Sequence, residues 1–546
     1  MSIRIGVACL CSMAMAVAGC GGGGSVESTL PTVTASGSPD ETGSERAVAA
    51  KGASDRQSGS ALPALQSDLP SALARSLARS PSGTRSHLLW QDETTTGYDQ
   101  AYAVAASERW VATAGAHFHI GPCVRGTGCG LDASLRVYDA KSGALRWTSE
   151  FDLGATADRN QAVAIAKDVI LTVGTSQNVS LTNRHIWWVM SAFDARTGTL
   201  LWRDVIGDKA TDYYPWQIAL QGKTAYVTGM VGATCATGAD SLSCDQFTRA
   251  YDIATGRVIW TNRADFAGGD DETLSVAATE NGIYVAGVVG RGPADPAGDE
   301  SVRALDPRNG RVLWEDVIHD PTGDGGVFKV VADDERVVIG AISNDDWLIR
   351  AYDAETGAVL WTQTYARTGV STPGVFDAPV QLAMQEGVVV AAGYGSTKVF
   401  GTEPYPKASR DWVVNGYDAK SGRLLWSDVY GAPDDIDEAN GGVVIAQGQA
   451  IAWGFTVTID AAGNKLQQPL LRSYDVHTGR IQWQDLIPRT GFPFGVTITL
   501  ATDGERVTAA SYVKGTRPPG ATPPDSFGVN LLVRTYDVRG HVEADE

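Results

Sequence analysis

Short stretches of alternating apolar and polar residues follow one another along the chain from residue 86 onward. The stretch 162–166, Ala-Val-Ala-Ile-Ala, is one example, and it is followed by Lys167-Asp168 and then by a second apolar stretch over 169–174. Short runs of this kind, separated by turn residues, are typical of antiparallel strands. The pattern predicts an all-β domain over residues 86–546.

One segment recurs eight times in this domain. Its copies are anchored by an aspartate, and these aspartates, spaced 47 to 65 residues apart, are Asp139, Asp194, Asp252, Asp306, Asp353, Asp418, Asp475 and Asp537. Seven copies also have Gly four residues and Trp eight residues after the Asp, the tryptophans being Trp147, Trp202, Trp260, Trp314, Trp361, Trp426 and Trp483. Self-similarity at such a period indicates a repeat architecture.

Each segment predicts a β-hairpin, because Asp opens a turn, Gly supplies the positive φ, and apolar residues alternate on both sides. A second pair of strands precedes each hairpin, so one unit has four antiparallel strands in about 57 residues. Eight four-stranded units with one Trp each are the signature of an eight-bladed β-propeller, in which the Trp fills the space between blades.

The two ends of the domain predict closure of the ring. The last hairpin, anchored at Asp537, has no Trp after it, whereas residues 88–92, Leu-Leu-Trp-Gln-Asp, match Leu-Leu-Trp-Ser-Asp at 424–428. We therefore expect the N-terminal strand to complete the eighth blade and to remove the open edges of the array.

The repeats, for example Ala-Phe-Asp-Ala-Arg-Thr-Gly-Thr-Leu-Leu-Trp at 192–202, resemble the tryptophan-docking motif of the quinoprotein-dehydrogenase-like propellers. Similar repeats occur in the outer-membrane assembly lipoproteins of Gram-negative bacteria. The resemblance implies the fold over about 450 residues. It does not by itself imply a function, because enzymes and non-enzymes share the motif.

The N-terminus predicts export. A charged start, an apolar stretch over 5–17 and the sequence Val-Ala-Gly-Cys at 17–20 are typical of a secretory signal over residues 1–19, with a lipobox. Cys20 would then be the lipid attachment site, and resemblance to other lipoproteins implies an outer-membrane location, on the periplasmic face or the cell surface. Residues 20–85 are rich in Gly, Ser, Ala, Pro and Thr and predict a flexible linker.

Charge and hydropathy limit the classes of molecule that the chain is expected to bind. The formal net charge is −19, and the chain has no basic tract, which argues against nucleic acid and anionic lipid headgroups. After the N-terminal stretch no run of 18 apolar residues follows, so the predicted contact with the membrane is the lipid alone. The propeller itself is expected to be monomeric.

Candidate binding residues lie at the end of the sheets that carries the long connections, since such loops usually carry function. One acidic residue precedes the innermost strand of seven blades, at Asp99, Asp158, Asp212, Asp271, Asp324, Asp377 and Asp437. These aspartates are interpreted either as a ring of carboxylates at the channel mouth or as residues that start a strand after a turn. Three tryptophans six residues before an anchor, Trp188, Trp347 and Trp412, are interpreted either as a stacking platform or as packing between blades.

Four cysteines remain after removal of the signal and lipidation of Cys20. An oxidising periplasm favours two loop disulfides, Cys123 with Cys129 and Cys235 with Cys244, over a zinc site beside His117 and His119. No catalytic, cofactor-binding or metal-binding residues are assigned.

Arginines recur three residues before the Asp anchor, as at Arg472, and aspartates recur two residues after the Trp, as at Asp428. These residues fall near each other across each hairpin, and they are interpreted either as structural ion pairs or as Arg stacked on Trp.

The leading functional hypothesis is a non-catalytic interaction scaffold in the bacterial envelope whose partner is an envelope protein or peptide. One alternative is a pyrroloquinoline quinone (PQQ)-dependent dehydrogenase, although the sequence has no adjacent Cys-Cys pair and no Cys-x-x-Cys-His haem site. A second alternative is a surface that binds glycans or cations.

Overall fold

The computed structural model describes residues 85–95, 99–118, 130–153, 157–180, 183–208, 211–232, 244–291, 298–320, 325–367, 377–400, 407–431, 436–459, 465–487, 497–515 and 528–542. These residues form 32 strands and no helix, so they include no helical segment able to cross a membrane. The predicted signal peptide, Cys20 and the linker up to residue 84 lie outside the described residues.

The first sixteen strands are β1 (Arg85–Glu93), β2 (Asp99–Ala106), β3 (Trp110–Phe118), β4 (Leu131–Asp139), β5 (Leu145–Phe151), β6 (Ala157–Ala166), β7 (Val169–Ser180), β8 (Asn183–Asp194), β9 (Leu200–Ile206), β10 (Asp212–Gln221), β11 (Thr224–Gly232), β12 (Cys244–Asp252), β13 (Val258–Ala264), β14 (Glu272–Ala278), β15 (Ile283–Gly290) and β16 (Gly298–Leu305). The others are β17 (Val312–Ile318), β18 (Gly326–Ala332), β19 (Arg336–Ser343), β20 (Asp346–Asp353), β21 (Val359–Tyr365), β22 (Ala378–Gln385), β23 (Val388–Phe400), β24 (Lys407–Asp418), β25 (Leu424–Tyr430), β26 (Glu438–Ala446), β27 (Gln449–Ile459), β28 (Lys465–Asp475), β29 (Ile481–Leu486), β30 (Thr497–Thr502), β31 (Arg506–Gly515) and β32 (Gly528–Val542).

These strands form antiparallel sheets of four in chain order. Six sheets are separate, and an eight-stranded sheet consists of β2–β5 and β6–β9 joined through a single parallel pair, Leu131 with Ala157. We number the four-stranded units sheet 1 (β2–β5), sheet 2 (β6–β9), sheet 3 (β10–β13), sheet 4 (β14–β17), sheet 5 (β18–β21), sheet 6 (β22–β25), sheet 7 (β26–β29) and sheet 8 (β30–β32 with β1).

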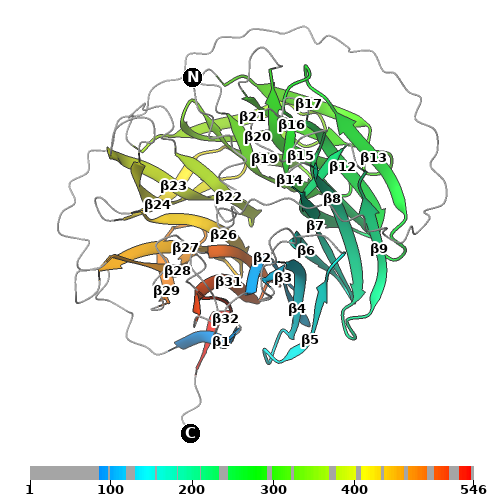
Figure 1. The fold of residues 1–546 in the computed structure, drawn as a ribbon. Helices are drawn as coiled ribbons and strands as arrows, with labels where there is room; N and C mark the ends of the chain where they lie inside the picture. The colour runs from blue at the N-terminus through cyan, green and yellow to red at the C-terminus, as the bar shows by residue number, and fades with distance from the viewer. Residues whose placement is uncertain are drawn as a thin grey trace. The chain divides into compact units, whose positions relative to one another are not determined.

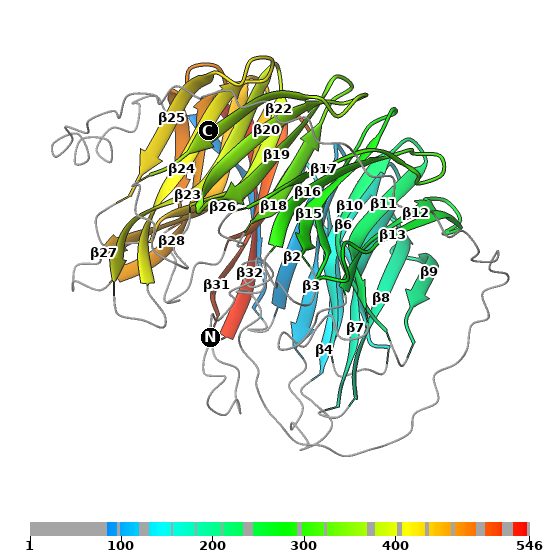
Figure 2. The same cartoon turned by 90° about the horizontal axis from the view of Figure 1, so that it is seen from above.

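The sheets pack face to face with their first strands inward. The first strands of successive sheets, such as β14, β18, β22 and β26, contact one another, while the last strands lie on the outside (Figure 1). Figure 2 shows β7 and β8 of sheet 2 side by side along their length. This arrangement of four-stranded antiparallel sheets is consistent with the predicted propeller.

In seven of the eight sheets a tryptophan from the last strand docks against the next sheet. Trp426 of sheet 6 donates its indole N–H to the Val476 carbonyl of sheet 7 at 2.8 Å. A β-carbon on Gly479, at φ 68°, would lie 2.6 Å from that ring, so only glycine leaves room for the indole. The same contact recurs in six further interfaces, with Trp90, Trp147, Trp202, Trp260, Trp314 and Trp361.

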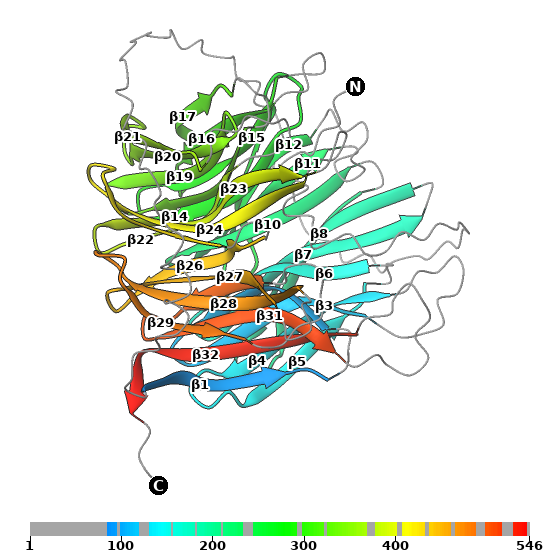
Figure 3. The same cartoon turned by 90° about the vertical axis from the view of Figure 1, so that its left-hand side faces the viewer.

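The N-terminal strand pairs as the sequence predicts. β1 is hydrogen bonded to β32, with Trp90 opposite Thr535 (Figure 3). Trp90 is buried in a hydrophobic cluster that joins sheet 8 to sheet 1. Trp483 of sheet 7 is the exception, because sheet 8 has no glycine four residues after Asp537, and His87 of β1 stacks on that indole instead, with 4.3 Å between ring centroids.

The ion pairs expected within each hairpin form between neighbouring sheets instead. Asp428 of sheet 6 accepts hydrogen bonds from the Arg472 guanidinium at 2.9 Å and the Tyr474 hydroxyl at 2.7 Å, both in sheet 7. The reason is strand geometry: side chains two residues apart face the same way, so the Asp follows the Trp toward the next sheet. The same triad occurs around Asp92, Asp204, Asp316 and Asp485.

Candidate functional site

Each predicted aspartate that the structure describes is buried at the start of a first strand. The exposed fractions are 6% for Asp99, 0% for Asp158, 1% for Asp212, 0% for Asp271, 5% for Asp377 and 1% for Asp437, and Asp324 lies outside the described residues. We call this end of the sheets the loop end, and the opposite end, where first and second strands are joined, the turn end.

These aspartates bind backbone groups of the surrounding connections. One carboxylate oxygen of Asp271 accepts a hydrogen bond from the Gly290 amide at the end of β15, and the other from the Phe266 amide that precedes β14. Asp377 repeats this arrangement with the amides of Ser396 and Arg367. The contacts match those of a residue that starts a strand after a turn, which is one of the two interpretations of the sequence.

Burial raises the pKa of several of these aspartates. Desolvation raises the pKa of Asp158 to about 6, that of Asp271 to about 7 and that of Asp377 to about 6, although backbone amides partly oppose the shift. At Asp99 the neighbour is His117, whose Nδ1 lies 2.7 Å from the carboxylate, and this hydrogen bond raises the pKa of the histidine.

The three tryptophans of the predicted stacking platform are fully buried. Trp188, Trp347 and Trp412 are each 0% exposed and lie in separate hydrophobic clusters between sheets. The Trp347 indole donates a hydrogen bond to the Tyr394 carbonyl, and the Trp412 indole to the Tyr474 hydroxyl. In this structure their rings therefore pack the interior.

Cys244, the first residue of β12, is disulfide-bonded and buried. Cys123, Cys129 and Cys235 lie outside the described residues, so the two pairings stay predictions.

Three carboxylates come together at the loop end of sheet 3 and the start of sheet 4. Oxygens of Asp245, Asp265 and Asp271 lie within 4.8 Å of one another. The Arg263 guanidinium contacts Asp245, and the Gly268 amide donates to Asp265 at 2.8 Å. The cluster adds to the raised pKa of Asp271, and a cationic side chain already contacts one of its members.

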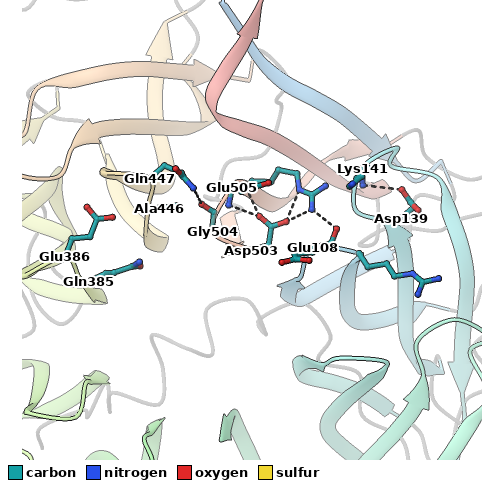
Figure 4. Close-up of a pocket in the computed structure, with 12 residues that line it drawn as sticks. Glu108, Asp139, Lys141, Gln385, Glu386, Ala446, Gln447, Asp503, Gly504 and Glu505 are labelled. Atoms are coloured by element: carbon teal, nitrogen blue, oxygen red, sulfur yellow. Dashed lines mark hydrogen bonds and ion pairs between the residues drawn. The ribbon is translucent and has the colours of Figure 1, made fainter. Parts of the chain in front are cut away.

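A depression of about 950 Å³ opens at the turn end (Figure 4). Turns of four sheets line it: 108–109 and 139–141 of sheet 1, 385–386 of sheet 6, 446–447 of sheet 7 and 503–506 of sheet 8. These turns are tight because the chain reverses between adjacent strands; Glu386, for example, has a φ of 55°.

Hydrogen bonds between sheets hold the rim of this depression. The Gly448 amide of sheet 7 donates to Glu386 of sheet 6 at 3.2 Å, and the Gln447 side chain donates to the Gly504 carbonyl of sheet 8 at 3.0 Å. Arg506 of sheet 8 reaches the Glu108 carbonyl of sheet 1 at 2.7 Å. Three successive interfaces are thus bridged at the rim, which makes it a rigid surface.

Acidic side chains outnumber basic ones around the depression. The basic groups Arg109, Lys141 and Arg506 accompany five acidic ones, Glu108, Asp139, Glu386, Asp503 and Glu505. Two of these carboxylates bind basic side chains: Asp503 binds Arg506, and hydrogen bonds from Arg146 and Ser142 hold the pKa of Asp139 well below its usual range.

The other three carboxylates, of Glu108, Glu386 and Glu505, are exposed around the opening (Figure 4). The depression therefore offers carboxylates and amide groups to a cationic or hydrogen-bond-donating partner. Sequence reasoning missed this surface because its residues come from short turns with no common motif.

Part of the sequence is similar to known proteins. The family described as outer membrane protein assembly factor BamB matches residues 298–516. BamB of Shewanella oneidensis is 24% identical over 237 residues, which cover 42% of this chain and 52% of that protein. Tetrathionate hydrolase of Acidithiobacillus ferrooxidans is 27% identical over 221 residues, 38% of each chain. The matches thus span about half or less of these relatives.

Among solved structures, the quinohemoprotein alcohol dehydrogenase of Comamonas testosteroni has a similar fold, with a TM-score of 0.50, 15% sequence identity, and coverage of 84% of this chain and 77% of that one. At this identity the likeness concerns the fold alone. The repeated Trp–Gly contacts between four-stranded sheets agree with both the sequence matches and the structural neighbour. The sequence matches and these contacts together support a propeller built from PQQ-like repeats.

Proposed function

We propose that this protein is a non-catalytic interaction scaffold of the bacterial envelope, and that the depression at the turn end binds a cationic segment of a partner protein or peptide. The observation that carries the proposal is the rim, where three exposed carboxylates are held by turns that hydrogen bonds fasten from sheet to sheet. A rigid polar surface loses little conformational entropy when a partner binds.

The envelope location is part of the proposal. The predicted signal over 1–19, lipid attachment at Cys20 and a linker over 20–85 would tether the propeller to the outer membrane. The similarity to BamB, an outer membrane protein assembly factor by name, supports an envelope scaffold.

We further propose that the sheets are the eight blades of a closed ring. Support comes from β1, which completes sheet 8, and from the cluster around Trp90 that joins sheet 8 to sheet 1. If the ring is closed in this way, Trp90→Ala will lower the melting temperature as much as Trp426→Ala does. An unchanged melting temperature would contradict closure.

The loop end is a second candidate surface, and there we propose a structural role for the aspartates. Their buried carboxylates bind the amides of adjacent connections, so Asp→Asn changes at Asp158, Asp271 and Asp377 should alter melting behaviour rather than partner binding. Loss of partner binding in that triple variant, with an unchanged melting temperature, would instead favour a carboxylate ring that binds a cation or glycan.

The enzymatic alternative is a PQQ-dependent dehydrogenase. The fold similarity to a quinohemoprotein alcohol dehydrogenase makes it worth testing, but the sequence has no adjacent cysteine pair to lie over the quinone. Dye-linked oxidation of an alcohol by the purified protein, after incubation with the quinone and calcium, would establish this alternative and overturn the scaffold proposal.

Site-specific photo-crosslinking in the producing cell tests the scaffold proposal. A photoreactive residue at position 447 should give a discrete crosslinked partner, while one at the exposed hairpin position 355, outside the depression, should not. Changing Glu108, Glu386 and Glu505 together to Gln should abolish the product, whereas Glu355→Gln, the matched control, should leave it unchanged. Equal crosslinking from both positions, or insensitivity to the triple change, would argue against the depression as the binding surface.

A further inference from the structure

The depression at the turn end has two walls of different charge. Hydrogen bonds along its rim join sheet 6 to sheet 7, sheet 7 to sheet 8, and sheet 8 to sheet 1. The turns of sheets 6 and 1 therefore lie at opposite ends of this arc, and Figure 4 shows Glu386 and Lys141 on opposite sides of the opening. We call these two parts the sheet 6 wall, residues 385–386, and the sheet 1 wall, residues 108–109 and 139–141.

The sheet 1 wall carries two cationic side chains, Arg109 and Lys141, and both are exposed. They come from different turns, which the Ala140 amide holds together by donating to the Arg109 carbonyl at 3.0 Å. The Arg109 guanidinium lies over the Trp110 ring, 4.8 Å from its centroid. The backbone thus brings two positive charges to the same wall.

These cations are not neutralised within the wall. Among the residues that the structure describes, neither the Arg109 nor the Lys141 side chain has a carboxylate within 4.0 Å. Asp139 is bound by Arg146 at 2.7 Å, so Glu108 supplies the remaining carboxylate of this wall. With two cations and one free carboxylate, the sheet 1 wall has a net positive charge.

The sheet 6 wall is acidic. Its two residues, Gln385 and Glu386, are exposed. One Glu386 carboxylate oxygen accepts a hydrogen bond from the Gly448 amide at 3.2 Å, and the second oxygen has no partner among the described residues. In the described lining of the depression, sheets 6 and 7 contribute no basic residue. This side of the depression therefore favours a cation.

We propose that the depression binds a peptide segment that carries one negative and one positive group, and that it binds the segment in one direction. A carboxylate of the partner would pair with Arg109 and Lys141, and a basic side chain with Glu386. Charge-assisted hydrogen bonds favour this direction, whereas the reverse direction places like charges together. The inference rests on the proposed scaffold function, whose partner segment it specifies. The carboxylate belongs either to the end of the partner chain or to an acidic side chain.

Short peptides test this polarity in solution. Fluorescence anisotropy with the full-length protein would use the peptide Lys-Ser-Gly-Ser-Gly-Leu, labelled at its N-terminus with an uncharged dye, with a free or an amidated carboxyl end. We expect the free form to bind about fivefold more tightly, the size of a favourable exposed charge interaction. A third, amidated peptide has Glu in place of its last Gly. Tight binding of that peptide assigns the carboxylate to a side chain, and weak binding assigns it to the chain end.

Variants of the two walls should have different effects. Arg109→Gln with Lys141→Gln should remove the preference for the free carboxyl end. Glu386→Gln should weaken the free and amidated forms by the same factor and keep the preference. Arg308→Gln with Lys420→Gln is the matched control, since both side chains are exposed on hairpins that do not line the depression, and it should change neither property.

Two outcomes of the titrations would overturn the inference directly. One is equal affinity of the unchanged protein for the free and the amidated peptide, which includes the absence of binding by both. The other is a preference for the free carboxyl end that survives Arg109→Gln with Lys141→Gln.

Crosslinking from position 447 separates this inference from the scaffold proposal. A partner that still crosslinks in the variant Arg109→Gln with Lys141→Gln, but not after the triple glutamate change, would leave the scaffold function standing and overturn the polarity. The absence of any crosslinked partner would count against the scaffold function itself, and the peptide titrations would still decide whether the depression is polar.

Discussion

Two interfaces between neighbouring sheets have the same tryptophan contact but different polar groups beside it. Between sheets 6 and 7, Asp428 binds Arg472 and Tyr474, and the arginine side chain is 3% exposed. Between sheets 3 and 4 the corresponding residues are Asn262, Arg303 and Leu305. There the guanidinium donates to the Asn262 side-chain oxygen at 3.2 Å, and Glu315 lies 3.7 Å away in the same sheet.

Between these two interfaces the acceptor and the tyrosine position differ together. A tyrosine hydroxyl in this place uses the carboxylate as its acceptor, so an interface without the carboxylate favours an apolar side chain such as Leu305. Between sheets 5 and 6, where Gln363 replaces the aspartate, Tyr417 is retained but accepts a hydrogen bond from Asn415 at 3.2 Å. Each of the three interfaces thus has its own set of polar contacts at these positions.

The tryptophan contact, by contrast, is the same in both interfaces. Trp260 donates to the Pro307 carbonyl at 2.8 Å, and Trp426 to the Val476 carbonyl at 2.8 Å. Each ring lies against a glycine with positive φ, Gly310 or Gly479. The shape of this contact is thus the same in both interfaces, while the polar network beside it varies.

The largest effect is expected from removal of the shared contact. Trp426→Ala and Trp260→Ala should each lower the free energy of unfolding by about 3–5 kcal/mol, because both indoles are largely buried and their loss leaves a cavity. Chemical denaturation measures the change. Clearly different losses at the two positions would show that the polar network, not the indole, sets the strength of an interface.

The next largest effect on stability should differ between the two interfaces. Asp428→Ala should cost about 3 kcal/mol, since it leaves the buried Arg472 without its carboxylate, whereas Asn262→Ala should cost about 1 kcal/mol. The same denaturation experiment compares them. Equal losses would mean that Arg303 depends on a charged partner as much as Arg472 does.

We expect the stability of the protein to depend on pH through a buried glutamate of sheet 4. Burial raises the pKa of Glu272 to about 8, above its ordinary value of 4.5, so the folded protein retains a proton that the unfolded chain releases. This contribution to stability is complete below about pH 4.5 and is lost as the pH rises through the folded-state pKa of about 8. Glu272→Gln should flatten the profile of melting temperature against pH between 5 and 9. A parallel profile for the variant would assign the dependence to other groups.

The smallest effect should come from converting one interface into the other. Asn262→Asp with Leu305→Tyr would recreate the triad around Arg303 and is expected to raise stability by about 1 kcal/mol. A double-mutant cycle should show favourable coupling, because each change is useful only with the other. Additive effects would contradict the view that the positions act as a unit.

The sequence alone determined the all-β class, the repeat and the pairing of the N-terminal strand. It could do so because turn residues and strand alternation are local, and because the match of residues 88–92 to 424–428 carries the same Trp–Asp spacing. It also located the aspartates that start the first strands, although it left two interpretations open.

Only the tertiary structure decided which groups meet between sheets. Asp428 could pair within its hairpin or with the next sheet, and packing of Trp426 against sheet 7 selects the second. Likewise, the burial of Trp188 depends on the neighbouring sheet, which supplies Phe247 against its ring. The depression arises from turns distant in sequence. No local pattern encodes it, because contacts between sheets depend on how the sheets pack and not on the spacing of residues within one of them.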